Sequence, residues 1–258
     1  MKNVLKPISS LGLKITLSTL LAMAALEAPA NDLEHPAEKR KFSLPPSADL
    51  LYTINAQQGG MQLSGNANLK WSAKEGRFLI ESETRSPLFG KVLDAKSEGR
   101  IDAYGLAPAS FTEKRLRKEA TVTSFDHASD LISFSASADT YPLKGGEQDR
   151  NSAIWQLIAV ARGAHGKFNA DSELRLFVAG QHDAETWVFK VDKQEKVHTA
   201  MGDFNAVHII KAPPDAKTQQ VELWLAPALE WYPVRIRFSE ANGDYIEQVL
   251  SSVAKSTD

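Results

Sequence analysis

Residues 234–250 read VRIRFSEANGDYIEQVL, and this stretch decides the fold because apolar and polar side chains alternate along it. In its first half Val, Ile and Phe alternate with Arg235 and Arg237, so one face of the strand is apolar and the other is basic. Asn242-Gly243 then supplies the backbone angles that a tight hairpin turn requires. The stretch therefore predicts a β-hairpin with one face in the core and one face in water.

The same alternation begins near Leu50 and recurs along the chain in short runs separated by Gly, Asn, Asp or Pro. About fourteen strands are expected from this pattern. Gly99–Ala103 is one of them, and Thr186–Val191 and Lys196–Met201 are two separate ones, while Glu75-Gly76 is a further hairpin turn. We therefore predict a mainly β protein: a single large curved antiparallel sheet or open barrel, meander-like, with one packed α-helix.

That helix is predicted between Asp149 and Arg162, where apolar residues recur three and four positions apart and Gly163 can end the helix. It packs against one face of the sheet or plugs the open end of a curved one. Its start allows two interpretations of Asp149 and Arg150. The free amide groups of a helix N-terminus can bind an anion. Asp149 can instead occupy that position itself and pair with Arg150, and this structural cap is the simpler interpretation.

The first 30 residues have the layout of a secretory signal peptide. Three lysines are followed by twelve apolar or small residues, and Ala28-Pro29-Ala30 suits cleavage after Ala30. An uncleaved anchor is the alternative, but a spanning helix needs about 20 apolar residues. We therefore predict export to the periplasm, with residues 31–47 as a flexible tether interrupted by prolines and residues 48–254 as a single all-β domain.

Composition excludes several classes of function. The chain has no cysteine, which rules out disulfides, thiol nucleophiles, thiolate metal sites and lipidation at an N-terminal cysteine. Without its first 30 residues it carries 27 Lys and Arg against 31 Asp and Glu. This mildly acidic balance gives no electrostatic reason to expect nucleic acid as a partner. No second apolar run of comparable length follows, so we expect no integral membrane segment after cleavage.

Recognisable motifs for catalysis are not found. The sequence has no Gly-x-Ser-x-Gly elbow and no glycine-rich phosphate loop. His198 and His208 lie on neighbouring predicted strands, but a surface pair is a simpler interpretation than a metal site. We predict no catalytic residue, no metal and no cofactor. A pair of carboxylates for glycoside hydrolysis remains open, because such pairs leave no spacing in the sequence.

Aromatic and basic residues are interleaved near the C-terminus, where they could line a ligand groove. The alternative is that the two arginines pair with Glu222 or Glu247 across neighbouring strands. The candidate ligand-binding residues are Trp224, Trp231, Tyr232, Arg235 and Arg237.

Several stretches resemble the domain-of-unknown-function 3108 family. The part similar to the family's C-terminal signature comprises Trp224-Leu225-Ala226-Pro227, Trp231 to Arg237, Asn242-Gly243 and Leu250. The other similar stretches are Ser97-x-Gly99, Gly105 to Phe111 and Gly146 to Ser152. The resemblance spans about Leu50 to Leu250. It implies an exported, mostly β proteobacterial protein and brings no activity or catalytic residue with it.

Three functions stay open at this point. The first is a periplasmic cell-envelope protein with a non-enzymatic binding or carrier role for a lipid, lipoprotein or glycan, and the missing catalytic motifs favour it. The second is a hydrolase or lyase that acts on cell-wall or exopolysaccharide material. The third is a structural partner in an envelope assembly, which predicts an exposed apolar patch or an unpaired strand edge.

Overall fold

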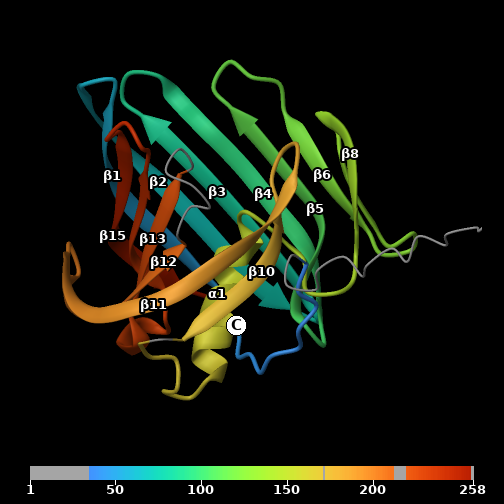
Figure 1. Cartoon of the computed structure of the whole chain (residues 1–258). Coiled ribbons are helices and arrows are strands. Elements are labelled where there is room, and N and C mark those ends of the chain that lie inside the picture. Colours follow the sequence, from blue (N-terminus) through green and yellow to red (C-terminus); the bar gives the residue numbers. More distant parts are fainter. Residues whose placement is uncertain (1–34, 171, 212–218, 257–258) are drawn as a thin grey trace, which may run out of the picture. The chain divides into compact units, whose positions relative to one another are not determined.

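The computed structural model describes residues 35–170, 172–211 and 219–256. The predicted signal peptide, the cleavage after Ala30 and residues 31–34 of the predicted tether lie outside these ranges. The described residues form fifteen strands, one α-helix and one short 3-10 helix (Figure 1). The elements are β1 (Ala48–Gln58), β2 (Met61–Lys74), β3 (Arg77–Ser86), β4 (Gly90–Asp102), β5 (Gly105–Arg115), β6 (Thr121–Asp126), β7 (Leu131–Phe134), β8 (Ser137–Pro142), β9 (Gln148–Asp149), α1 (Ser152–Gly163), β10 (Glu173–Ala179), β11 (Ala184–Thr199), β12 (Gly202–Lys211), β13 (Gln220–Leu225), η1 (Pro227–Leu229), β14 (Pro233–Ser239) and β15 (Tyr245–Lys255).

All fifteen strands belong to one sheet, in the order β8-β7-β6-β5-β4-β3-β2-β1-β15-β14-β13-β12-β11-β10-β9. From β1 to β8 and from β10 to β15, strands that follow each other in the sequence pair antiparallel, and β1 also pairs antiparallel with β15, so two meanders are joined through the first and last strands. Only β9 and β10, which α1 connects, run parallel. The sheet is not closed, because β8 and β9 are its two edges. The predicted fold class, a mainly β meander with one helix, is confirmed.

The helix α1 lies inside the curve of the sheet (Figure 1) and is buried on almost every side. A helix that is apolar around most of its circumference belongs in a core rather than on a surface. Trp155 stacks on Trp71 of β2 with ring centroids 4.6 Å apart, and its edge meets Tyr232 at 6.2 Å. Among the described residues no helix is long and apolar enough to cross a membrane.

The β9–β10 edge of the sheet folds over the inner face of the first meander. Phe177 and Ala179 of β10 pack against a cluster of buried side chains from β4 to β7, which includes Phe111 and Phe125. Thr123 Oγ1 of β6 donates a hydrogen bond of 2.7 Å to the carbonyl oxygen just after β10, at Gly180. In the described part of the chain α1 and β10 therefore fill the space enclosed by the sheet.

Residues 35–47, for which the sequence predicts a flexible tether, lie against the domain. His35 Nε2 is 2.8 Å from Glu147 Oε1, and the Ser43 amide donates to the carbonyl oxygen of Ala159 in α1 at 2.9 Å. The indole N–H of Trp71 donates to the carbonyl oxygen of Pro45. Prolines interrupt regular backbone pairing but keep their carbonyl acceptors. The segment therefore has no strand or helix and is still held by specific bonds.

Two strands are longer than the alternating pattern predicts. Thr186–Val191 and Lys196–Met201 were expected as separate strands, but β11 runs through the region between them with a β-bulge near Val191. Likewise β4 begins at Gly90, nine residues before the predicted start. The intervening residues of β11 are polar and mostly exposed, and the buried positions of the missed part of β4 are the small residues Ala95 and Ser97, so both stretches carry little apolar signal. The predicted turn at Glu75-Gly76 is confirmed by φ values of 52° and 72°.

Candidate functional site

Asp149 lies at a buried junction between the sheet and the start of α1. Its Oδ1 accepts the backbone N–H groups of Asn151 and Ser152, each at 2.8 Å, and its own N–H donates to Ser152 Oγ at 2.9 Å. Ser97 Oγ of β4 donates to Asp149 Oδ2 at 2.5 Å. This reciprocal pattern has the form of a capping box just ahead of α1, whose own N-cap residue Asn151 makes no side-chain cap hydrogen bond. Asp149 therefore ties the start of α1 to β4.

Burial raises the pKa of Asp149 to about 6, although the hydrogen bonds from Ser97 and the helix start act in the opposite direction. Arg150 is exposed and its guanidinium lies over Gly180, where an added Cβ would be 2.7 Å from Nη2. Gly105 lies directly against α1, because an added Cβ at this position would overlap the side chain of Gln156. Residues that carry the family resemblance thus build the joint between helix and sheet.

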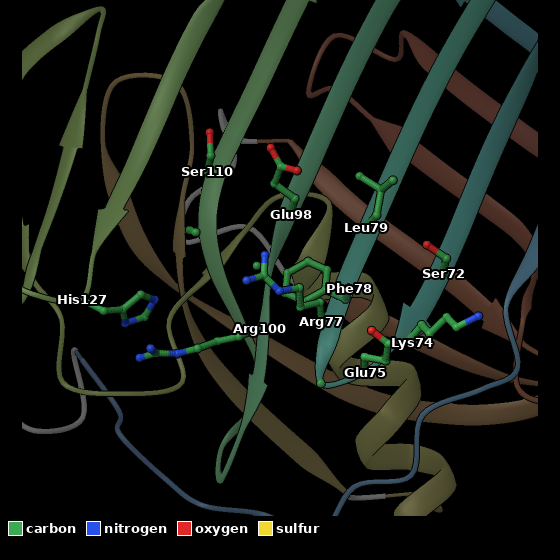
Figure 2. A pocket seen from close by; sticks show the side chains of 13 residues that line it. Ser72, Lys74, Glu75, Arg77, Phe78, Leu79, Glu98, Arg100, Ser110 and His127 are labelled. Atoms are coloured by element: carbon green, nitrogen blue, oxygen red, sulfur yellow. The ribbon is translucent and has the colours of Figure 1, made fainter.

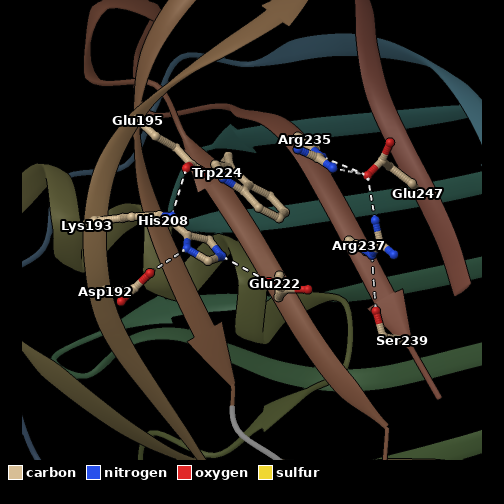
Figure 3. Close-up of polar contacts among 10 residues, drawn as sticks. All are labelled: Asp192, Lys193, Glu195, His208, Glu222, Trp224, Arg235, Arg237, Ser239 and Glu247. Atoms are coloured by element: carbon tan, nitrogen blue, oxygen red, sulfur yellow. Dashed lines mark hydrogen bonds and ion pairs between the residues drawn. The ribbon is translucent and has the colours of Figure 1, made fainter. Parts of the chain in front are cut away.

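The five candidate ligand residues do not share one surface. Tyr232 is fully buried, and its hydroxyl donates to the carbonyl oxygen of Pro46 at 2.7 Å. Trp231 has a positive φ of 65° and packs edge-on against Phe168, with centroids 6.2 Å apart. Both residues follow η1 and belong to the core or its margin. The other three, Trp224, Arg235 and Arg237, lie together on the outer face of β13 and β14 (Figure 3).

The Trp224 ring is held between a histidine and an arginine that occupy the same register on the neighbouring strands. His208 of β12 stacks on the ring at 4.4 Å, and the Arg235 guanidinium of β14 lies over it at 4.5 Å. The indole N–H donates to a carboxylate oxygen of Glu195. The His208 nitrogens also contact carboxylates, Nδ1 that of Asp192 at 3.0 Å (Figure 3). We call this set, with Arg237 and Glu247, the paired ladder.

Glu247 of β15 completes the paired ladder. It accepts hydrogen bonds from Arg235, one of them at 2.8 Å from Nε, and its Oε1 is 3.3 Å from Arg237 Nη1. Arg237 also lies over the Tyr245 ring at 4.3 Å. These contacts correspond to the cross-strand pairing that the sequence left as the alternative. Ligand binding by the five candidate residues stays a prediction.

A different set of basic residues surrounds a hollow of about 670 Å³ on the outer face of β2 to β5 (Figure 2). Lys74, Arg77 and Arg100 line it together with smaller and polar side chains. In Figure 2 Arg100 extends from β4 toward His127. We call the three cations the basic rung and the space they line the basic hollow. Its other polar side-chain lining residues are Ser72, Glu75, Glu98, Ser110 and His127.

The basic rung is set by strand register. Lys74 of β2 is opposite Arg77 of β3, and Arg77 is opposite Arg100 of β4, so three cations occupy one line across the sheet. All three side chains are exposed, and no carboxylate oxygen of a described residue lies within 4.0 Å of their nitrogens. Like charges directly opposite one another destabilise a sheet. The rung is thus a line of three cations without a direct ion pair among the described residues, although Glu75 and Glu98 line the same hollow.

Local backbone features fix the hollow in place. The Glu75-Gly76 turn joins β2 to β3, and the Ile101 amide donates to the Gly76 carbonyl oxygen at 2.7 Å, which holds this turn against β4. A β-bulge interrupts the pairing of β4 with β5 between Glu98 and Gly99. Bulges bend a strand and redirect its side chains, and they recur beside functional sites.

Sequence reasoning missed the basic hollow because it depends on register. Arg77 and Arg100 are far apart in the chain, and neither belongs to an aromatic or glycine-rich motif. One signal was available: Lys74 and Arg77 flank a predicted two-residue turn, so they must face each other. The position of Arg100 beside Arg77 follows from the pairing of β3 with β4. This pairing was not predicted, because the sequence pattern made β4 too short.

A metal centre is not found among the described residues, where no three His, Cys, Asp or Glu side chains are grouped to hold an ion. His198 does not meet His208 across the hairpin. Its Nδ1 instead contacts Asp203 Oδ1 at 2.8 Å, and the cross-strand partner of His208 on β11 is Lys193.

Residues 51–251 match the model of the family described as "Protein of unknown function (DUF3108)", so the chain belongs to this family and the predicted resemblance is confirmed. No curated protein matches the chain. A DUF1329 family protein from Desulfovibrio piger is a solved structure with 9% identity and a TM-score of 0.33, covering 83% of this chain and 87% of its own. A LolA superfamily protein from Nitrosomonas europaea has 11% identity and a TM-score of 0.23, covering 86% and 90%. No function is transferred from similarities this low.

Proposed function

We propose that this protein is a non-enzymatic binding protein of the bacterial cell envelope, and that it holds the anionic groups of a lipid or glycan in the basic hollow. The observation that carries the proposal is the basic rung: Lys74, Arg77 and Arg100 occupy one register line across three strands, and no carboxylate oxygen of a described residue lies within 4.0 Å of their nitrogens. A bound phosphate or carboxylate would supply the missing charge. Arginine suits this task because its planar group donates two parallel hydrogen bonds to such anions.

The dimensions of the hollow favour a small charged group. Its volume is about 670 Å³, and it is open to solvent rather than enclosed, which suits a polar group bound at the surface. Acyl chains would need an apolar interior, and α1 and β10 occupy the inner side of the described sheet. The recognised part is therefore a headgroup or an acidic sugar, and not a hydrocarbon chain. The envelope location rests on the signal-peptide pattern of residues 1–30.

Binding is tested by titration calorimetry with two anionic probes and one neutral probe. Trigalacturonate represents an acidic glycan, glycerol phosphate represents a lipid headgroup, and maltotriose is the uncharged control. We expect at least one anion to bind, and the Arg77→Gln/Arg100→Gln double variant to bind it at least about tenfold more weakly. Lys70→Gln, on the same face of β2 but outside the hollow, changes affinity by less than about twofold.

Two results would contradict the proposal. One is that neither anion binds. The other is that the Arg77→Gln/Arg100→Gln double variant binds the anion as tightly as the unchanged protein does. The two probes also separate the sources of the anion, because a site for an acidic sugar prefers trigalacturonate and a headgroup site prefers glycerol phosphate. New reducing ends in the trigalacturonate sample would show that the protein cleaves this glycan, and would favour the enzymatic alternative over a binding role.

A further inference from the structure

We infer that the tips of the β3–β4 and β5–β6 hairpins insert into the surface of an anionic lipid bilayer. Leu88 and Phe89 form the β3–β4 tip, and Leu116 lies at the β5–β6 tip; we call these three residues the apolar tip. Leu88 is 75% exposed, Phe89 49% and Leu116 39%. Large apolar side chains at such exposure cost free energy in water, and several of them together indicate an interaction surface.

The two hairpin tips form one surface because β4 and β5 are neighbours. Leu93 is paired with Arg115, and the Leu116 amide donates to the Val92 carbonyl oxygen at 2.9 Å. Figure 1 shows both hairpins projecting at the same end of the sheet. Gly90, with a φ of 69°, turns the chain directly after Phe89. The apolar tip is therefore presented on two adjacent turns.

The charge around the apolar tip favours an anionic bilayer as the occupant. Residues 113–119 contain four basic and two acidic side chains, although the whole chain has a net charge of −2. Arg117 and Lys118 have no carboxylate within 4.0 Å among the described residues, and Lys114 has only Glu119 at 3.9 Å. Exposed apolar residues with free cations beside them are the pattern of shallow insertion into lipid headgroups.

The other basic residues near the apolar tip are already neutralised. Lys91 is 2.7 Å from Glu83 and 2.8 Å from Asp94, and Arg85 is 2.5 Å from Glu83. The surplus of positive charge thus lies on the β5–β6 turn. Two small turns offer little area for a stable protein interface, which commonly buries about 800 Å² on each partner. A bilayer surface needs no such area, because each side chain inserts by itself.

The apolar tip and the basic hollow are at opposite ends of the same strands. Arg77 begins β3 and Ser86 ends it, and ten residues of strand span about 33 Å. A bilayer at the tip would leave the hollow open to another ligand. The inference therefore stands independently of the proposed function, and the two can fail separately.

The absence of cysteine allows a direct test by single-site labelling. Residues 31–258 form a compact unit of their own. In this unit Leu88→Cys is labelled with the polarity-sensitive fluorophore NBD, and Met201→Cys, an apolar residue 42% exposed on the β11–β12 turn, is the matched control. On mixing with vesicles of phosphatidylcholine containing 30% phosphatidylglycerol, we expect a blue shift and a several-fold intensity gain at position 88 only.

Unlabelled variants give the second readout, by co-sedimentation with the same vesicles. Leu88→Ser/Phe89→Ser should lower the partition coefficient at least about tenfold, since two inserted side chains are lost. Arg117→Gln/Lys118→Gln should lower it about fivefold on anionic vesicles and leave it unchanged on pure phosphatidylcholine. Met201→Ser should have no effect.

Three outcomes would overturn the inference: no binding to anionic vesicles, equal fluorescence changes at positions 88 and 201, or unchanged partitioning of Leu88→Ser/Phe89→Ser. Loss of vesicle binding in Arg77→Gln/Arg100→Gln, with Leu88→Ser/Phe89→Ser unaffected, would place the lipid in the basic hollow instead. That last result would support the proposed function and refute insertion of the apolar tip. The failure of one hypothesis can therefore be told from the failure of the other.

Discussion

The outer faces of the two meanders use arginine in opposite ways. In the second meander Arg235 and Arg237 both contact Glu247 and lie over aromatic rings, so their charges are balanced within the sheet. In the first meander Arg77 and Arg100 are cross-strand partners, and no carboxylate oxygen of a described residue lies within 4.0 Å of their nitrogens. The contacts of the paired ladder are those of a cluster that stabilises the sheet. The basic rung instead has cations that are available to bind an anion.

This difference teaches that residue type alone does not identify a ligand surface. The conspicuous tryptophan and arginine residues of the C-terminal region attract attention in the sequence, yet their polar groups contact other residues of the chain. A surface that binds an anion must keep its cations available, which costs stability in the absence of the ligand. Incomplete pairing is therefore the more informative signal, and it becomes visible only when the register is known.

The largest expected effect concerns the buried joint at Asp149, which connects the first meander to α1. We expect this joint to contribute to the free energy of unfolding, and to do so in a pH-dependent way because Asp149 titrates. Burial raises the pKa of Asp149 to about 6, so the folded state binds this proton more tightly than the unfolded chain does. The free energy of unfolding should thus fall as pH rises from about 4 to about 6, by up to about 3 kcal/mol.

Asp149→Asn tests this joint, because asparagine can still accept the two helix amides and does not titrate in this range. Urea unfolding at a series of pH values should show the difference between the protein and the variant changing by about 2–3 kcal/mol between pH 4 and 6.5, in favour of the variant at the higher pH. Parallel curves for the two proteins would mean that Asp149 does not hold a buried proton.

A smaller effect is expected from breaking the paired ladder. Glu247→Gln removes the charge that Arg235 and Arg237 share, and all three side chains are partly shielded from water. We expect a loss of about 1–2 kcal/mol in the free energy of unfolding. The matched control is Glu98→Gln beside the basic rung, where the pair with Lys96 is exposed and its loss should cost less than about 0.5 kcal/mol. Equal losses would remove the distinction between the two faces.

The smallest expected effect has the opposite sign. Arg100→Gln removes one of the three like charges of the basic rung, so the free energy of unfolding of the ligand-free protein should rise by a few tenths of a kcal/mol at low salt. The gain should disappear in high salt, because exposed charges are then screened. Thermal unfolding at two salt concentrations measures it. Destabilisation at low salt would show that Arg100 has a structural partner.

The fold was largely predictable from the sequence, whereas the candidate site was not. Alternation along the chain gave a mainly β meander, and helical spacing placed the helix within three residues of the start and one of the end of α1. Bulges and exposed polar stretches hid the full lengths of β4 and β11. The basic rung depends on the β3–β4 register, which makes Arg100 the cross-strand partner of Arg77.

The most direct test compares two double variants for binding and stability in the same samples. Arg77→Gln/Arg100→Gln should lose at least about tenfold in affinity for the anion that the unchanged protein binds, without a fall in its melting temperature. Arg235→Gln/Arg237→Gln should keep the affinity and melt at a lower temperature, because Glu247 loses both of its partners. The reverse pattern, with binding lost only in Arg235→Gln/Arg237→Gln, would contradict the account and return the ligand site to the C-terminal strands.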